Sequence, residues 1–108
     1  MCGIAAIYNI RDNKFDGLKN IQRILKNINH RGPDEQNYIS INQCYLAIAR
    51  LSIIDIKNGG QPKVDLTNNF YIVFNGEIYN YLEIKRKLES LNFKFKTNSD
   101  TEVVLNSY

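Results

Sequence analysis

The feature that most constrains this chain is a short apolar segment, rich in β-branched residues, that begins almost at the N-terminus. Residues 4–10 run Ile-Ala-Ala-Ile-Tyr-Asn-Ile and stop at the polar group Arg11, Asp12 and Asn13. A segment of this length, bounded by polar residues, predicts a buried strand. Because the strand has almost no chain before it, we expect the fold to hold the N-terminus in place.

Helical spacing marks the next segment. Apolar residues recur three or four positions apart and polar residues fill the other face, which predicts an amphipathic helix over residues 17–29. Its apolar face consists of Leu18, Ile21, Leu25 and Ile28. Residues 30–34 (HRGPD) follow, and their glycine and proline are expected to end the helix in a loop.

Strands are expected in the middle of the chain. Residues 38–41 and 45–49 alternate around Asn42 and Gln43, which predicts a β-hairpin. Residues 70–74 (FYIVF) are apolar throughout and predict a central strand buried on both faces. The apolar segment 51–56 lies between them, closed by a turn-forming run rich in glycine.

The last third of the chain alternates between helix and strand. Asn80 followed by Glu83 is typical of a capped helix start. Residues 93–96 (FKFK) alternate apolar and charged, which predicts a strand buried on one side. Ser99 and Glu102 have the spacing of a second capping box before a final helix.

These segments predict an α+β fold with antiparallel hairpins. The chain has 108 residues, and domains hold about 100 to 150, so one small domain is expected. Hydrophobic residues make up 44% and charged residues 23%. Both values lie near the globular averages of about 45 to 50% and 25%, which excludes a disordered class. The chain stops inside the predicted last helix, a poor place for a domain boundary, so we expect a truncated chain.

Composition also restricts the partners and the cellular location. The longest apolar run, residues 4–8, is far shorter than the roughly 20 residues that cross a bilayer. No signal-peptide pattern is present, so we expect a cytoplasmic protein without a membrane partner. The net charge of +3 comes from scattered basic residues and gives no support to nucleic-acid binding. Cys2 and Cys44 lack the paired spacing of a zinc site, so no metal is expected.

Cys2 is the residue best suited to chemistry. Removal of Met1 would leave a thiol and a free α-amine on one residue, so that nucleophile and base coincide. The amine has a pKa of about 7.7 to 8.0 and can accept the thiol proton near neutral pH. On this feature alone, an incidental N-terminal cysteine is the simpler interpretation. Cys44 lies in an apolar strand and is expected to be a buried small hydrophobe.

Five groups of residues, in one order, resemble the glutaminase domain of the asparagine synthetase family, a class II glutamine amidotransferase. They are MCGI at residues 1–4, HRGPD at 30–34, RLSIID at 50–55 with GQP at 60–62, NGEIYN at 75–80 and SDTE at 99–102. Each motif alone is weak, but together they span nearly the whole chain in the order of the family.

The resemblance implies an N-terminal-nucleophile hydrolase fold, a four-layer αββα sandwich of two antiparallel sheets. Residues 1–108 would be the N-terminal part of a type-2 glutamine amidotransferase domain, with the synthetase domain absent. The implied function is the glutaminase half of a glutamine-dependent asparagine synthetase. Glutamine would be hydrolysed to glutamate and ammonia, and the ammonia passed to an ATP-activated carboxylate, with aspartate as the expected acceptor.

Matching positions imply roles for individual residues. Cys2 would attack the side-chain amide of glutamine, and Asn75 and the Gly76 N–H would form the oxyanion hole. Arg50 would bind the α-carboxylate of glutamine, and Asp100 its α-ammonium group. The substrate-binding set also includes residues that would help to line the pocket: Leu51, Ser52, Ile53, Ile54 and Glu77.

The resemblance also implies partners. L-glutamine is the expected ligand, and the C-terminal synthetase domain is the expected partner, with a homodimer in the full-length protein. No cofactor is expected in residues 1–108, whereas ATP and magnesium are expected in the synthetase domain.

The residues alone leave other interpretations open. Asn75-Gly76 is also a common turn pair, Asp100 suits the first turn of a helix, and Arg50 could be a surface cation. A loop histidine such as His30 is more often structural than catalytic. The whole chain could be a non-catalytic fragment that binds only glutamine or a partner, or an amidotransferase that acts on another acceptor such as a sugar.

Overall fold

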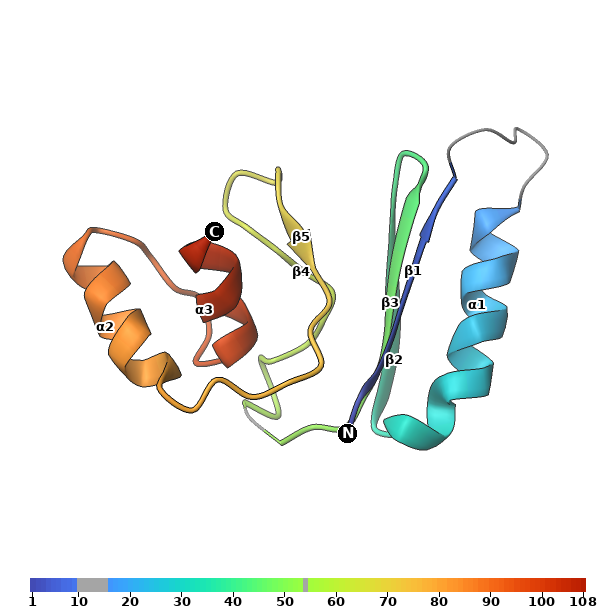
Figure 1. Ribbon diagram of the computed structural model, residues 1–108, viewed down its shortest axis with the longest axis horizontal. Helices are drawn as coiled ribbons and strands as arrows, with labels where there is room; N and C mark the ends of the chain where they lie inside the picture. Colours follow the sequence, from blue (N-terminus) through green and yellow to red (C-terminus); the bar gives the residue numbers. More distant parts are fainter. Residues whose placement is uncertain (10–15, 54) are drawn as a thin grey trace.

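The structure is a computed structural model that describes residues 1–9, 16–53 and 55–108. These residues form two parts that lie side by side along the longest axis (Figure 1). One part is a three-stranded sheet with a long helix, and the other is a two-stranded sheet with two shorter helices. The molecule measures 47 × 29 × 18 Å.

The larger sheet contains β1 (Gly3–Tyr8), β2 (Glu35–Ile41) and β3 (Cys44–Arg50), in the order β1-β3-β2. Both pairings are antiparallel, with Gly3 opposite Ala49 and Ile41 opposite Cys44. The hairpin predicted around Asn42 and Gln43 is confirmed. Asn42 has a φ of 53°, in the left-handed region that asparagine tolerates. The first predicted strand is also confirmed up to Tyr8, and its last residue, Ile10, lies outside the described residues.

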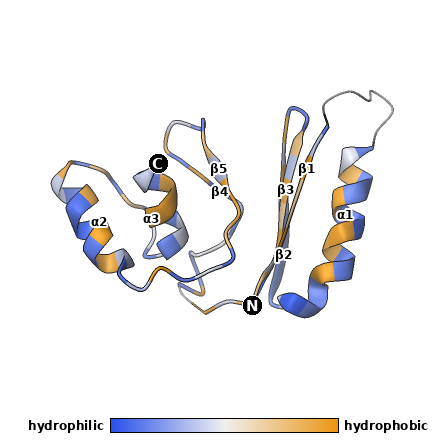
Figure 2. Cartoon of the chain, in the orientation of Figure 1, coloured by the Kyte–Doolittle hydropathy of each residue, from blue (hydrophilic) through white to orange (hydrophobic). Residues whose placement is uncertain are grey.

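The helix α1 (Gly17–Ile28) covers one face of this sheet and confirms the predicted helix. Asp16 caps it, since its carboxylate accepts the Lys19 N–H at 2.9 Å. Apolar and polar residues alternate along the helix (Figure 2), and Ile21, Leu25 and Ile28 pack on the sheet as expected. Leu18, expected on the same face, is 43% exposed and does not belong to the core. That core contains Ile21, Leu25, Ala47 and Ala49, with Ala5, Ile7, Ile28 and Tyr45 packed against it. A short 3₁₀ helix, η1 (Asn29–Arg31), follows α1.

The opposite face of the sheet carries the other half of each strand, because side chains alternate between the faces of a strand. Ala47 and Ala49 pack against α1, so Ile48 and Arg50 point to the other side. By the same alternation Cys2, one residue before β1, belongs to the face of Arg50. The strand positions therefore place Cys2 and Arg50 together on the face turned away from α1.

The second part is built from β4 (Lys63–Val64), β5 (Tyr71–Ile72), α2 (Tyr81–Ser90) and α3 (Asp100–Ser107). The strands pair antiparallel, with Lys63 opposite Ile72. The prediction of a long central strand at residues 70–74 is wrong. Only two of these residues are in a strand, because β4 offers a partner for only two, and Phe70 is 47% exposed.

Three other local predictions are corrected in this part. Residues 93–96 form no strand, because no strand of the described residues pairs with them, and Phe93 is 48% exposed. Asn80 precedes α2 but its side chain makes no capping hydrogen bond. Ser99 caps α3 as predicted, whereas Glu102 accepts the N–H groups of Lys96 and Thr97 rather than that of Ser99.

The described residues thus form a mixed α and β structure with two antiparallel sheets, in agreement with the predicted α+β class. Among the described residues, no helix is long and apolar enough to span a membrane.

Candidate active site

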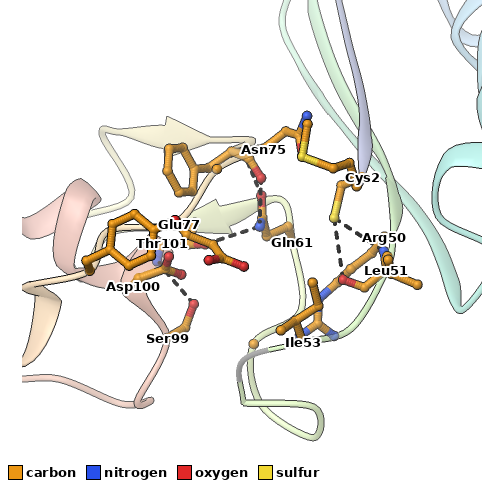
Figure 3. A pocket seen from close by; sticks show the side chains of 15 residues that line it. Cys2, Arg50, Leu51, Ile53, Gln61, Asn75, Glu77, Ser99, Asp100 and Thr101 are labelled. Atoms are coloured by element: carbon orange, nitrogen blue, oxygen red, sulfur yellow. Dashed lines mark hydrogen bonds between the residues drawn. The ribbon is translucent and has the colours of Figure 1, made fainter.

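A cavity of about 330 Å³ lies where the two parts meet (Figure 3). Five separate segments line it: the N-terminus, the end of β3 with the loop after it, the loop before β4, the segment between β5 and α2, and the start of α3. The lining includes eight residues with an expected role in the site: Cys2, Arg50, Leu51, Ile53, Asn75, Gly76, Glu77 and Asp100.

The thiol of Cys2 is held against the main chain just after β3. The Leu51 N–H donates to the Cys2 sulfur at 3.3 Å, and the thiol can donate to the Leu51 carbonyl at 3.5 Å (Figure 3). The antiparallel pairing of Gly3 with Ala49 brings Cys2 close to Leu51. Cys2 is half-buried and lines the cavity, so its sulfur is both positioned and accessible.

The HRGPD loop, residues 30–34, supports this arrangement from outside the cavity. Arg31 Nε donates to the Cys2 carbonyl at 3.2 Å, and the Asp34 carboxylate accepts the Ser52 N–H at 2.8 Å. Gly32 packs tightly on β3, since a Cβ there would lie 2.1 Å from the Ala49 carbonyl oxygen. The loop therefore fixes the main chain on both sides of the thiol. His30 is exposed and does not line the cavity; its Nδ1 lies 3.1 Å from the Asn27 carbonyl.

Arg50, the last residue of β3, is 5% exposed and its guanidinium is well fixed. Nη1 forms an ion pair with Glu35 at 3.2 Å and also donates to the Ile56 carbonyl at 3.4 Å. Nη2 donates to the Asp55 carbonyl at 3.1 Å. These contacts place a permanent positive charge in the wall of the cavity.

Asp55 connects this wall with the start of α3. Its carboxylate accepts the Asn98 N–H at 3.0 Å and the Asn58 N–H at 3.1 Å. The hydrogen bond from Asn98 is the main reason that the pKa of Asp55 lies below its usual value, because it favours the charged form. Asp55 is therefore ionised at neutral pH, and its carboxylate joins the loop after β3 to the segment that precedes α3.

Asn75, Gly76 and Glu77 line the cavity opposite the sheet, after β5 (Figure 3). Asn75 is half-buried, and its side-chain amide forms no hydrogen bond with another residue of the described chain. Gly76 is close to the Phe74 ring, which a Cβ would approach to 2.8 Å. An unused amide NH₂ next to a glycine N–H is suited to stabilising a negatively charged oxygen.

Asp100 is a buried carboxylate at the first position of α3, with 5% of its surface exposed. It accepts the Thr101 N–H at 2.8 Å and the Ile78 N–H at 3.2 Å. Among the described residues it forms no ion pair with a basic side chain. A buried carboxylate at the wall of a cavity, with no cationic partner in the described part of the chain, is suited to binding a positively charged ligand group.

Two members of the expected substrate-binding set are not placed in the cavity. Ser52 does not line it, and its N–H is used by Asp34. Ile54 lies outside the described residues.

The cavity is also lined by residues that the sequence did not indicate as part of the substrate site. They are Met1, Gly59, Gln61, Phe74, Tyr79, Ser99 and Thr101. The GQP motif was a signal for Gln61, and the capping pattern was a signal for Ser99, but neither pattern indicated a place in the cavity.

Comparisons with known proteins agree with this geometry. The family described as "Glutamine amidotransferase domain" matches residues 1–108. The chain is 41% identical over 110 residues to asparagine synthetase [glutamine-hydrolyzing] 1 of Bacillus subtilis, and 37% identical over 108 residues to a probable asparagine synthetase [glutamine-hydrolyzing] of Schizosaccharomyces pombe. It is 38% identical over 108 residues to asparagine synthetase [glutamine-hydrolyzing] 2 of Oryza sativa subsp. japonica.

Each of these alignments covers the whole of this chain but only a small share of the relative. The chain spans 17% of the B. subtilis protein, 19% of the S. pombe protein and 18% of the rice protein. The match along its full length, together with a cavity lined by residues of four of the five motifs, shows that this chain belongs to the glutamine amidotransferase domain family.

Proposed function

We propose that this chain is the glutaminase part of a glutamine-dependent asparagine synthetase. The observation that carries the proposal is the content of one cavity: a thiol, an amide, a guanidinium and a buried carboxylate. Among the described residues the amide donors are unused and the carboxylate has no cationic partner. These four groups complement the reacting amide, the α-carboxylate and the α-ammonium of glutamine. The family match and the names of the relatives support the same substrate.

The proposed chemistry begins at Cys2 after removal of Met1. The α-amine takes the thiol proton, and the sulfur adds to the side-chain carbonyl carbon of glutamine. Negative charge develops on the amide oxygen, where the Asn75 NH₂ and the Gly76 N–H donate to it. The protonated amine then gives its proton to the leaving nitrogen, and ammonia departs. Water attacks the γ-glutamyl thioester at Cys2, which releases glutamate and restores the thiol.

The charged ends of glutamine are assigned to opposite sides of the cavity. Arg50 binds the α-carboxylate, and Asp100 binds the α-ammonium group. The main chain after Arg50 and the segment after Gly76 complete the pocket through Leu51, Ile53 and Glu77, which line the cavity. Both charged groups come from buried positions, so little side-chain entropy is lost when they bind.

The proposal extends to the rest of the protein. The two antiparallel sheets are consistent with an N-terminal-nucleophile hydrolase fold, in which they form the inner layers of a four-layer sandwich. The relatives are far longer than this chain, which supports the presence of a further domain in the full-length protein. In this proposal that domain is a synthetase, which uses ATP and magnesium and transfers the ammonia to aspartate. A homodimeric, cytoplasmic enzyme is part of the same proposal.

Product analysis of the full-length protein tests this function. We expect one glutamate and one ammonia for each glutamine consumed, and asparagine as a further product when ATP, magnesium and aspartate are added. Asparagine offered as the hydrolysis substrate is the control, since its amide is one methylene short of the thiol. A full-length protein that forms no glutamate from glutamine would contradict the glutaminase assignment. Glutamate formation with transfer of ammonia to a sugar, and not to aspartate, would contradict only the acceptor.

Substitution of Arg50 by lysine tests whether Arg50 binds the α-carboxylate of glutamine. A lysine keeps the charge but loses the paired donors of the guanidinium, so we expect KM for glutamine to rise about 10- to 100-fold. Steady-state kinetics of the full-length protein with L-glutamine measure the effect. The control substrate is L-glutamine α-amide, which lacks the α-carboxylate. Its KM should rise much less on the same substitution. An equal loss with both substrates would instead assign Arg50 to holding the loop through Asp55 and Ile56.

A further inference from the structure

We propose that Gln61 is a positioning residue that holds Asn75 and Asp100 at a fixed separation across the candidate site. The inference rests on the proposed function, because it concerns the same glutamine pocket. Gln61 belongs to the GQP motif, and the residue is 6% exposed. It lies between the segment that carries Asn75 and the start of α3 (Figure 3).

The first two contacts of Gln61 fix the residue before Asn75. Its Oε1 accepts the Phe74 N–H at 2.6 Å, and its Nε2 donates to the Phe74 carbonyl at 3.1 Å. The side chain thus pairs with both main-chain groups of Phe74, as a neighbouring strand would. Because β5 ends at Ile72, this pairing continues the support of the main chain up to the proposed oxyanion donors.

The third contact reaches the other side of the pocket. Gln61 Nε2 donates to the Thr101 hydroxyl at 3.1 Å, and this hydrogen bond is buried. Thr101 is the second residue of α3, and its N–H donates to the Asp100 carboxylate. One amide therefore connects the segment of Asn75 with the helix start that carries Asp100.

The hydrogen-bonding capacity of an amide explains why the role is positioning. The NH₂ group has two donors, and these are used by the Phe74 carbonyl and by Thr101. Although Gln61 lines the cavity, its polar atoms face the protein. Loss of the side chain would leave the partly buried N–H and carbonyl groups of Phe74 without these partners, which is unfavourable and allows the segment to move.

Two pairs of variants of the full-length protein separate the contacts. Gln61→Met keeps the volume and removes all three hydrogen bonds, whereas Gln61→Glu keeps an acceptor for the Phe74 N–H and sets a carboxylate oxygen against the Phe74 carbonyl. Thr101→Val removes only the contact to α3, and Thr101→Ser restores the hydroxyl. Ammonia release gives kcat and KM for glutamine. Labelling with a glutamine-like electrophile counts the competent sites, so that kcat is expressed for each labelled site.

The two contacts should affect different kinetic constants. For Gln61→Met, which removes both contacts, we expect kcat per labelled site to fall about 10- to 100-fold, because a displacement near 1 Å can cost a factor of about 100, and KM to rise as in Thr101→Val. Gln61→Glu should show a loss in the same direction. For Thr101→Val we expect KM to rise about threefold to tenfold with little change in kcat, and Thr101→Ser to restore it. The double variant Gln61→Met/Thr101→Val should be no worse than Gln61→Met, since both act through one network.

Two results would overturn the inference while leaving the proposed function intact. One is that Gln61→Met and Thr101→Val both show the wild-type kcat per labelled site and the wild-type KM. The other is a loss that follows only the number of labelled sites, which indicates a general effect on folding. If Gln61→Met does not fold, the Thr101→Val and Thr101→Ser pair decides the question alone. A wild-type protein that does not hydrolyse glutamine, run in the same assay, would overturn the proposed function and the inference with it.

Discussion

Replacement of Cys2 by alanine is expected to abolish glutamine hydrolysis by the full-length protein. Removal of a nucleophile eliminates the covalent route altogether, and losses of about 10³-fold or more are typical of such variants. Release of ammonia from glutamine is the measurement. The reaction of the thiol itself can be followed separately, because a glutamine-like electrophile should label Cys2 and block turnover in proportion to labelling.

Cys44 provides a matched control for the same experiment. It is also a free cysteine of intermediate exposure, but it lies at the start of β3, opposite Tyr8, and does not line the cavity. Cys44→Ala should therefore keep wild-type turnover, and peptide mass spectrometry should find the label on Cys2 in preference to Cys44. Equal labelling of both cysteines would contradict the assignment of the nucleophile.

The state of the N-terminus belongs to the same test. A peptide bond to Met1 would block the α-amine of Cys2, which then could not accept the thiol proton. We expect mass spectrometry of the active protein to show Cys2 as its first residue. Full activity in a protein that retains Met1 would require another base and would remove the proposed role of the amine.

Local patterns predicted those elements whose partners lie nearby in the sequence. The periodicity of residues 17–29 predicted α1 because one amphipathic face decides both its conformation and its packing. The hairpin of β2 and β3 needed only a two-residue turn. Residues 70–74 have an equally strong apolar pattern, yet hydrophobicity does not reveal how much backbone is available for pairing, and β4 pairs with only two of them.

The candidate site was predictable to a different extent. The family motifs pointed to Cys2, Arg50, Asn75 and Asp100, and the structure brings all four to one cavity, although their roles stay predictions. Their support was not predictable from periodicity. The contacts of Gln61 with Phe74, and of Glu102 with Lys96 and Thr97, join side chains to main-chain groups, which leave no repeating pattern in a sequence. Such contacts depend on the tertiary fold, so only the structure reveals them.

Substitution of Asn75 by alanine is expected to lower kcat for glutamine about 100- to 1,000-fold, which is the usual cost of losing one oxyanion donor. KM should change little, because the donor acts mainly in the transition state, where charge develops on the amide oxygen. The side-chain amide of bound glutamine is uncharged and needs the donor less. Glutamate formation at saturating and at low glutamine separates the two constants. The Gly76 N–H remains in this variant, so a residual rate is expected.

Asn75→Asp and Asn80→Ala make the interpretation specific. Aspartate has nearly the size of asparagine but no NH₂ group, and it places negative charge where the oxyanion forms, so its kcat should fall below that of Asn75→Ala. Asn80 lies five residues further along, is exposed, makes no capping hydrogen bond and does not line the cavity, so Asn80→Ala should match the wild type. If Asn75→Asp were as active as the wild type, the amide could not be a donor to the transition state. Asn75 would then be only a turn residue between β5 and α2, and the Gly76 N–H would have to stabilise the oxyanion with a donor other than the Asn75 amide.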